Sequence, residues 1–438
     1  MRAVAPETKR LFMKDESIAP VPRWYRLTPF LGRPPALTAN QWKVLGLVAV
    51  VSLFEQYDVY LFALNLKQIQ SDLAVGDENL GFLGALVRAG SFLAVILAVA
   101  ADHWGRRSML MITVWGYTLF TGATAFAPNA ETFVVFQFLS RGFASAELMI
   151  AAVVITEEFA PEHRGWGIGA LAAIQACGAG LASLLFGFVE YLPYGWRSLY
   201  IVGLFPLVLI AYWRRTLPET SRFQNIAREQ AKKNVILPMF ELIRANPKRV
   251  VALLSAVFAF GIASSTAAFF APKYLQDVHA WSTGDVAILM VCGGAFAIVG
   301  NPMAGWLSDT LGRRPVTVVF SIAYTVVCVA FYTIGGFFTP LLWVGLIFFV
   351  MGTDVTLTSL GAELFPTAQR STASGLKGIV GTLAAILGLS AVSALYLIVH
   401  SNWIAIAILC SAALVVPFVV WFFIPETAGR TLEDINGE

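Results

Sequence analysis

Charged residues are scarce in this sequence. Only 13% of its 438 residues are Asp, Glu, Lys or Arg, whereas 58% are hydrophobic; soluble domains carry about 25% charged residues. The hydrophobic residues are spread along the whole chain and are not confined to one core. This composition excludes an ordinary soluble domain and predicts an all-α protein that crosses the lipid bilayer many times.

Several motifs that would mark other classes of protein are missing. The four cysteines lie in apolar segments without CxxC or metal-ligand spacing, so we expect no disulfide framework, no bound metal and no other cofactor. The sequence has no P-loop and no evident nucleophile–base pairing, so we do not expect an enzyme. The net charge of +3 gives no sign of a nucleic-acid partner. Residues 1–40 are polar and basic and lack a signal-peptide pattern, so we expect a cytoplasmic tail there.

Long apolar runs predict the membrane-spanning helices. A helix that crosses a bilayer needs about 20 mostly apolar residues, and the sequence contains twelve such runs. The predicted spans are 42–66, 80–101, 109–127, 131–155, 166–190, 196–214, 250–273, 284–308, 315–336, 340–361, 372–398 and 403–424.

The distribution of basic residues predicts the orientation of these spans. On the side that holds both termini fall 25 of the 30 lysines and arginines, including Lys377 on the inner side of its span, whereas three fall on the other side and Arg88 and Arg141 lie deeper within spans. Because cytoplasmic segments are enriched in Lys and Arg, we expect both termini in the cytoplasm and the protein in the plasma (inner) membrane. The expected units are a tail (1–40), a six-helix bundle (41–215), a cytoplasmic loop (216–248), a second six-helix bundle (249–424) and a tail (425–438).

Two short motifs each occur twice at the same separation. "ADHWGRR" ends the second span and "SDTLGRR" the eighth, while "LPET" follows the sixth span and "IPET" the twelfth. Asp102 and Asp309 are 207 residues apart, and so are Pro218 and Pro425. The shared offset predicts a duplicated six-helix unit. Such repeats are common in transporters, which hold substrate near the bilayer midplane between two halves.

These motifs resemble those of the major facilitator superfamily. The motif G-x-x-x-D-x-x-G-R-R is complete from Gly305 to Arg314, and Ala98 replaces its first glycine in the first half. "PETAGRTLEDI" (425–435) resembles the tail motif of sugar porters and organic-ion transporters. The resemblance covers nearly the whole chain beyond residue 40. It implies twelve helices in two halves related by a pseudo-two-fold axis, alternating access to a central site, and a monomer.

The repeated polar motifs are candidates for a gate at the cytoplasmic ends of the helices. Glycine allows a tight reversal of the chain, and the acids can accept hydrogen bonds from helix N-termini or pair with arginines. We expect such bonds to form when the inner gate is shut and to break when it opens; alternatively, these residues only anchor loops. The candidate gating residues are Asp102, Gly105, Arg106, Arg107, Glu158, Arg164, Gly305, Asp309, Gly312, Arg313, Arg314, Glu363 and Arg370.

Seven charged side chains lie within the predicted spans and away from their ends. They are the acids Glu55, Asp58, Glu147 and Asp354 and the bases Arg88, Arg141 and Lys377. A charge at bilayer depth is unfavourable by several kcal/mol. We therefore expect these groups to line a central cavity or to pair with one another, and not to face lipid.

The first two acids indicate coupling to protons. "FEQYD" (54–58) resembles the F-G-Y-D stretch of sugar porters and the D-G-Y-D stretch of aromatic-acid/proton symporters, where the aspartate takes up the proton and pairs with an arginine on the fourth helix. Here Gln137 stands at the position of that arginine, and Arg141 lies one helical turn further on. We expect proton transfer at Asp58 or Glu55, and the alternative is a static buried ion pair. Glu147 fits equally a second proton site, a cation ligand or the partner of an arginine.

The same residues form a candidate substrate site. The two arginines favour an organic anion, above all a carboxylate-bearing metabolite. The residues predicted to contact substrate are Arg88, Arg141, Gln137, Gln175, Tyr57, Tyr117 and Asp354. The predicted function is secondary active transport of a small organic ion or metabolite by proton-coupled symport. The alternatives are an organic-cation or drug exporter, a sugar carrier of the same fold, and a transport-inactive binding protein or receptor.

Overall fold

The structure is a computed structural model that describes residues 19–214, 236–334, 336–366 and 369–430. Its regular elements in these ranges are helices, as the sequence predicts. Within the described ranges, ten helices are long and apolar enough to cross a membrane, and they overlap ten of the twelve predicted spans. The other two predicted spans overlap α5 (Arg106–Thr124) and α8 (Trp196–Arg214). For these two helices, crossing of the membrane remains a prediction.

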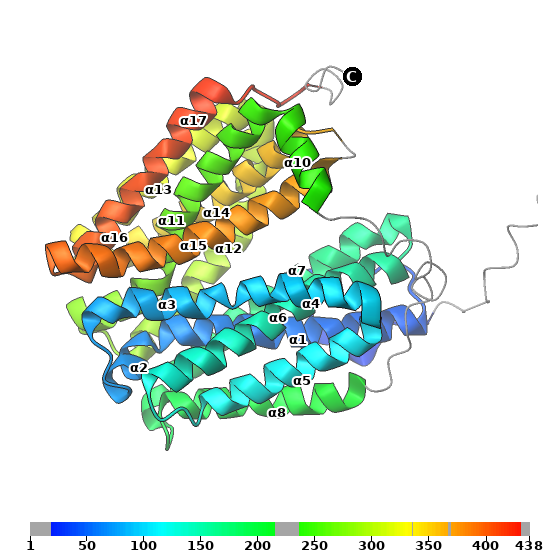
Figure 1. The fold of residues 1–438 in the computed structure, drawn as a ribbon, viewed down its shortest axis with the longest axis horizontal. Helices are drawn as coiled ribbons and strands as arrows, with labels where there is room; N and C mark the ends of the chain where they lie inside the picture. Colours follow the sequence, from blue (N-terminus) through cyan, green and yellow to red (C-terminus); the bar gives the residue numbers. More distant parts are fainter. Residues whose placement is uncertain (1–18, 215–235, 335, 367–368, 431–438) are drawn as a thin grey trace, which may run out of the picture.

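The helices form two groups in the order of the chain (Figure 1). The first group, here the N-terminal bundle, contains η2 (Arg23–Leu27), η3 (Pro29–Leu31), α1 (Ala39–Leu64), α2 (Leu66–Asp72), η4 (Asp77–Asn79), α3 (Leu80–Ala89), α4 (Ser91–Trp104), α5, α6 (Ala130–Glu158), α7 (Pro161–Phe186), η5 (Val189–Tyr191) and α8. The second group, the C-terminal bundle, contains α10 (Ile236–Ala245), α11 (Pro247–Val278), α12 (Thr283–Leu311), α13 (Arg313–Thr333), η6 (Gly336–Phe338), α14 (Thr339–Glu363), α15 (Arg370–Val399), α16 (Asn402–Cys410), η8 (Ser411–Leu414) and α17 (Val415–Phe423).

Local sequence signals set several helix boundaries. Thr38 and Gln41 form a capping box at the start of α1, and each side chain accepts a hydrogen bond from the other residue's backbone N–H. Gly105 and Gly312 separate α4 from α5 and α12 from α13, with φ of 92° and 106°. Because side chains with a Cβ rarely adopt such angles, glycine permits the tight reversal at both copies of the GRR motif, as expected.

Among the described residues, the main contacts between the two bundles lie toward one end. At this end, here called the distal end (residues 65–79, 187–195, 273–283 and 399–402), α3 packs on α15, α7 on α12 and α1 on α11. The opposite end, here called the terminal end, carries the start of α1 and the end of α17. Figure 1 shows the bundles close together at the distal end and separated toward the terminal end. In the part of the chain that the structure describes, the main inter-bundle contacts therefore lie on one side.

Polar groups join the bundles at the distal end. Lys67 donates a hydrogen bond to the Gln276 carbonyl at 3.0 Å and forms an ion pair with Asp277 at 3.1 Å. Gln68 donates to the side chain of Gln276 at 2.7 Å. Lys273, buried beside these groups, contacts Asp277 and lies 3.9 Å from Asp77 of the other bundle. These contacts must break before the distal end can open.

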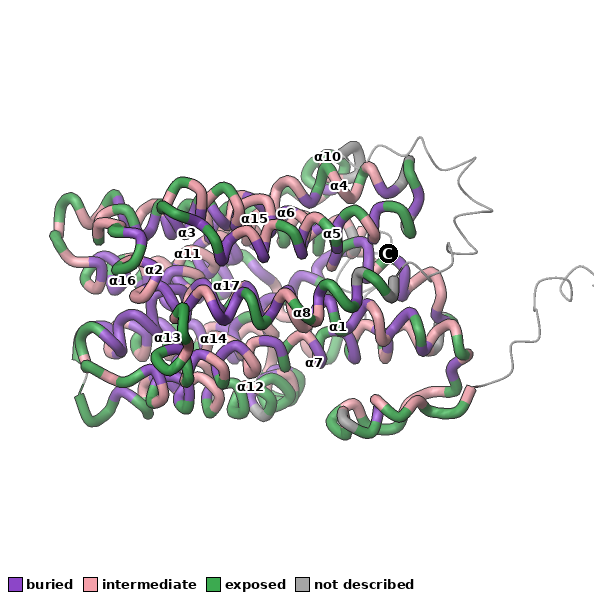
Figure 2. Tube along the Cα trace, turned by 90° about the horizontal axis from the view of Figure 1, so that it is seen from below, coloured by how far each residue is buried: buried purple, intermediate pink, exposed green. Residues whose placement is uncertain are grey.

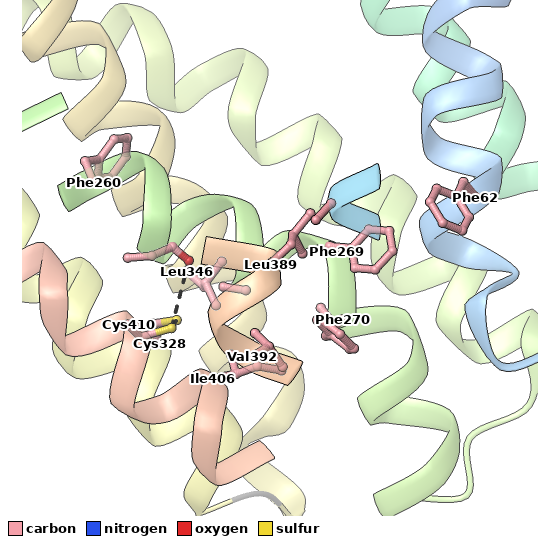
Figure 3. Close-up of a cluster of buried hydrophobic side chains, with 14 of the residues drawn as sticks. Phe62, Phe260, Phe269, Phe270, Cys328, Leu346, Leu389, Val392, Ile406 and Cys410 are labelled. Atoms are coloured by element: carbon pink, nitrogen blue, oxygen red, sulfur yellow. Dashed lines mark hydrogen bonds between the residues drawn. The ribbon is translucent and has the colours of Figure 1, made fainter. Parts of the chain in front are cut away.

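Apolar side chains fill the interior of both bundles. Buried positions follow the helix faces that pack together, and exposed positions follow the outer faces (Figure 2). Figure 3 shows one large buried cluster, in which Phe62 of α1 faces Phe269 of α11. Their rings are 5.0 Å apart and nearly perpendicular, so α1 contacts the other bundle through an aromatic pair. The same cluster contains Cys328 and Cys410, whose sulfurs lie 2.8 Å apart as free thiols.

Candidate functional site

Two carboxylates of α1 lie inside the N-terminal bundle. Glu55 and Asp58 are three residues apart and only 5% and 7% exposed, so neither faces lipid. Ser140 of α6 donates a hydrogen bond to Asp58 Oδ2 at 3.3 Å. The Ser140 hydroxyl also lies 2.8 Å from that of Thr121 on α5. Asp58 therefore accepts a hydrogen bond from a hydroxyl of α6, which in turn contacts a hydroxyl of α5.

Neither carboxylate is fully partnered. Among the described residues, Glu55 Oε2 and Asp58 Oδ1 are buried without a hydrogen-bond partner, and no ion pair within 4.0 Å joins either acid to an arginine. Arg141 nevertheless interacts electrostatically with both. A static ion pair would place the charged atoms in direct contact. The geometry instead leaves acceptor oxygens that can bind a proton or a ligand.

Two arginines lie next to each other on α3 and α6. Arg141 Nε donates to Ser91 Oγ of α4 at 3.3 Å, and Arg88 interacts electrostatically with Arg141 and with Tyr60. Gly90, between α3 and α4, allows this arrangement, because a Cβ there would lie 2.1 Å from the Phe138 carbonyl of α6. Both guanidinium groups are half-buried. Two adjacent positive charges that are partly removed from water attract an anion.

The predicted substrate contacts outside this group occupy different surroundings. The side chain of Gln137 is buried near Asp58 and donates to Thr124 at 3.1 Å. The hydroxyls of Tyr57 and Tyr117 donate to the backbone carbonyls of Leu199 and Phe54 at 2.8 Å and 2.7 Å. Both tyrosines thus fasten neighbouring helices within the N-terminal bundle.

Two further predicted contacts lie on other helices. Gln175, on α7, is half-buried. Asp354 of α14 forms an ion pair with Lys377 of α15 at 3.6 Å, and its side chain is 59% exposed. The structure therefore brings together Glu55, Asp58, Arg141, Gln137 and Arg88, and places Asp354 in a separate ion pair in the other bundle.

The gating motif of the C-terminal bundle forms one polar cluster. Arg313 pairs with Asp309 at 2.6 Å and with Glu363 at 2.9 Å, and it also donates to Ser308. These contacts all lie within one bundle, although the bundles are apart at this end. The cluster can therefore exist without closure of the terminal end.

Arg164 and Arg370 make the same contact in the two bundles. The Nε of each arginine donates to the backbone carbonyl five residues earlier, Phe159 at 3.2 Å and Phe365 at 3.4 Å. This contact ties the start of α7 and of α15 to the preceding turn. The repeat visible in the sequence thus has a structural counterpart in both bundles.

The remaining gating candidates lie mostly in the N-terminal bundle. Glu158 accepts a hydrogen bond from Asn40 at 3.2 Å, and its carbonyl accepts one from Gln41 at 2.8 Å. Both donors belong to the start of α1. The side chains of Asp102 and Arg106 lie outside those that the structure describes. Further candidates are Arg107, which is exposed on α5, Gly305, which is half-buried on α12, and Arg314 at the start of α13.

Sequence reasoning missed the role of Glu426. Its carboxylate accepts hydrogen bonds from the backbone N–H groups of Arg313 and Arg314 at 2.8 Å and 3.0 Å, and so caps the start of α13. The neighbouring Thr427 donates to Glu363. Glu426 belongs to the second copy of the repeated PET sequence. From the sequence, this repeat indicated only the duplication of the six-helix unit.

The chain matches known proteins along most of its length. The sequence profile of the Major Facilitator Superfamily matches residues 48–389. The chain belongs to the major facilitator superfamily. It is therefore a multi-pass membrane transporter, in agreement with the prediction that it is not an enzyme.

Individual relatives agree with this membership. A niacin transporter of Acinetobacter baylyi is 25% identical over 429 residues, which cover 90% of this chain and 96% of the relative. A cis,cis-muconate transport protein of the same species is 27% identical over 364 residues, 80% of this chain and 86% of the relative. An inward-open structure of the xylose transporter of E. coli superposes with a TM-score of 0.71 at 16% identity, covering 90% of this chain and 99% of that one. The likeness to the xylose transporter supports the fold alone.

Proposed function

We propose that this chain is a proton-coupled symporter for a small organic anion, with a carboxylate-bearing metabolite as substrate. The observation that carries the proposal is the group of two incompletely partnered carboxylates, Glu55 and Asp58, beside Arg141 and Arg88 inside a membrane-embedded bundle. The relatives named for niacin and cis,cis-muconate support a carboxylate, because both compounds carry one. The proposal includes twelve spans in two pseudo-symmetric halves, cytoplasmic termini, the inner membrane and a monomer.

Coupling follows from competition for one positive charge. Burial disfavours an ionised carboxylate, whereas a nearby guanidinium favours it. A substrate carboxylate bound at Arg141 neutralises the charge that Glu55 and Asp58 share. Binding of the anion therefore favours protonation of these acids, and protonation in turn frees Arg141 for the anion. Proton and substrate then bind together.

Alternating access would use the two ends of the molecule. With the termini in the cytoplasm, the structure corresponds to a state closed outside and open inside. Substrate from outside requires separation of the distal contacts around Lys67, Gln276 and Asp277. Closure of the terminal end would bring the gating motifs of the two bundles together.

The test is uptake into proteoliposomes with an imposed pH gradient, using niacin, benzoate and cis,cis-muconate as probes. We expect the wild type to accumulate at least one of them. Asp58→Asn should abolish accumulation but retain counterflow exchange, because the variant binds substrate without carrying the proton. Glu190→Gln, at an exposed acid of η5, is the control. Accumulation by Asp58→Asn at the wild-type level would contradict proton coupling at this residue.

An organic cation is the second candidate substrate. The observation that favours it is that Glu55 interacts electrostatically with two other acids, Asp58 and Glu147, and with one arginine. An amine could serve as the counter-charge of such a group. Including amines among the probes decides between the two: accumulation of amines but not of carboxylates would favour the cation.

A further inference from the structure

Helix α5 directs a row of hydroxyl groups toward the carboxylates. The row comprises Thr113, Tyr117, Thr121 and Thr124, which are all buried and lie on one side of the helix. Thr121 contacts Ser140, which binds Asp58, whereas Thr113 contacts Glu147 of α6. Two members of the row, Thr121 and Thr113, are therefore associated with different acids.

Thr113 has one hydroxyl hydrogen but three oxygen neighbours. Its Oγ1 lies 2.6 Å from Glu147 Oε2, 2.8 Å from the Met109 carbonyl and 3.2 Å from the Leu110 carbonyl. A hydroxyl has one donor and two acceptor positions. If Thr113 donates to Met109, as threonines in helices often do, the short contact to Glu147 needs a hydrogen on the carboxylic acid. A protonated Glu147 donating to Thr113 satisfies all of these contacts together.

Glu147 and Asp58 occupy different depths in the bundle. Asp58 contacts Ser140, and Glu147 lies seven residues beyond Ser140 on α6, about 10 Å nearer the terminal end. Glu55 interacts electrostatically with both Glu147 and Asp58. The three acids therefore form a series along the bundle, with Glu55 in electrostatic contact with both of the others.

We infer that Glu147 is a second proton-binding site and that Thr113 is the residue that positions its proton. The inference rests on the proposed proton-coupled transport and adds one proton to it. In the protonated state the acid O–H of Glu147 donates to Thr113. When Glu147 releases the proton to water, Thr113 turns its hydroxyl to the carboxylate. The Thr113 hydroxyl thus forms one hydrogen bond with Glu147 in both states. It accepts this bond when Glu147 is protonated and donates it when Glu147 is ionised.

The surroundings of Glu147 include charged groups from several helices. Facing the same interior are Glu55 and Asp58 of α1, Tyr117 of α5 and Arg141 of α6, with Arg88 of α3 beyond Arg141. Helix α4 has no ionisable side chain among those described. On α7, the described ionisable side chains are His163, Arg164 and Cys177. Among these described groups, Arg141 is the base that interacts with both α1 acids.

The number of protons per substrate tests the inference. In proteoliposomes, the logarithm of the accumulation ratio of niacin, or of whichever probe is accumulated, rises with the imposed pH difference, and the slope gives the number of coupled protons. We expect the slope of Glu147→Gln to be lower than that of the wild type by one. Asp58→Asn is measured in parallel. If Asp58→Asn keeps the wild-type slope, the proposed coupling at Asp58 fails; if its slope falls while Glu147→Gln keeps the wild-type slope, only the second site fails.

Thr113 is tested by the pH profile of transport. Thr113→Val removes the hydroxyl. Because hydrogen bonds to ionised groups are about twice as strong as neutral ones, the ionised form of Glu147 loses more stabilisation than the protonated form. We expect the midpoint of the pH profile to rise by roughly half a unit to one unit, while Thr113→Ser restores it. Thr118→Val is the matched control, because Thr118 is buried on the same helix and bonds to the Val114 carbonyl. A Thr113→Val profile superimposed on that of Thr118→Val would overturn the role of Thr113.

Discussion

The C-terminal tail is held to the start of α13 by Glu426, and its replacement gives a sharp prediction. The carboxylate accepts hydrogen bonds from the N–H groups of Arg313 and Arg314 at 2.8 Å and 3.0 Å, and from those of Thr427 and Ala428 at 2.9 Å each. Burial alone would raise the pKa of Glu426. The hydrogen bonds from Ala428, Arg314, Arg313 and Thr427 outweigh burial and lower its pKa below the usual value.

The magnitude follows from known effects of helix capping. Loss of a capping side chain destabilises a helix by about 0.5–2 kcal/mol, and a negative charge at a helix N-terminus contributes about 0.3–1 kcal/mol. Because Glu426 is half-buried, water replaces part of the lost hydrogen bonding. We expect Glu426→Ala to lower the free energy of unfolding by about 1–2 kcal/mol. For a cooperative unit the size of one bundle, this lowers the melting temperature by roughly 2–8 °C.

The lowered pKa of Glu426 determines how its contribution to stability changes with pH. A carboxylate with a lowered folded-state pKa stabilises the protein above its unfolded value, about 4.3, and this contribution is lost as pH falls through the lower folded value. The melting-temperature difference between wild type and Glu426→Gln should be constant above about pH 5 and shrink below about pH 4.3. Tryptophan fluorescence during thermal unfolding in detergent measures this difference in melting temperature. Glu131→Gln, at an exposed acid in the first turn of α6, is the control. An unchanged difference down to pH 3, roughly one unit below the reference value, would refute the reasoning.

Three further predictions concern the bundles and the arginines. Lys67→Glu should repel Asp277 and reduce uptake, because the Lys67–Asp277 pair joins the bundles at 3.1 Å. Lys67→Arg keeps the positive charge and should retain uptake, and proteoliposome uptake rates measure both variants. Gly90→Ala places a Cβ 2.1 Å from the Phe138 carbonyl and should lower the unfolding free energy by about 1–3 kcal/mol. Thermal unfolding measures this effect, with Gly180→Ala as the control, because a Cβ at Gly180 has no atom within 4 Å. Arg88→Gln should weaken binding of a carboxylate probe about tenfold or more, because a hydrogen bond to a charged group is worth about 1.5–3 kcal/mol. Titration calorimetry measures the affinity of the probe for both proteins, and unchanged affinity would exclude Arg88 from the site.

The sequence predicted the positions of the long helices well, because a membrane-spanning helix needs a long apolar run and such a run can be recognised from local composition alone. Each of the twelve predicted spans overlaps a helix of the structure. The GRR repeats also predicted the turns at Gly105 and Gly312, since only glycine adopts their backbone angles readily. In contrast, α3 and α4 fall in one predicted span, 80–101, which gave no sign of a break at Gly90.

The partners of the buried acids could not be predicted from the sequence. Asp58 contacts Ser140, which is 82 residues away, and Glu147 contacts Thr113 on another helix. Serine and threonine are frequent in membrane helices, where their hydroxyls often bond to the preceding turn. Only the packing of α1, α5 and α6 shows which hydroxyls meet a carboxylate. The arginine that the sequence suggested as the partner of Asp58 is not among the groups in direct contact with it, which include Ser140.

In the proposed mechanism, coupling between proton binding and bundle movement would pass through few elements. Glu55, Asp58 and Glu147 all lie in the N-terminal bundle, and so do both arginines of the proposed site. Phe62 follows Asp58 by four residues, on the same side of α1, and packs against Phe269 of the other bundle. Helix α1 is thus one element that carries both an acid of the site and an inter-bundle contact. If Asp58 is the coupling residue, as proposed, a single helical turn of α1 separates it from this contact with the C-terminal bundle.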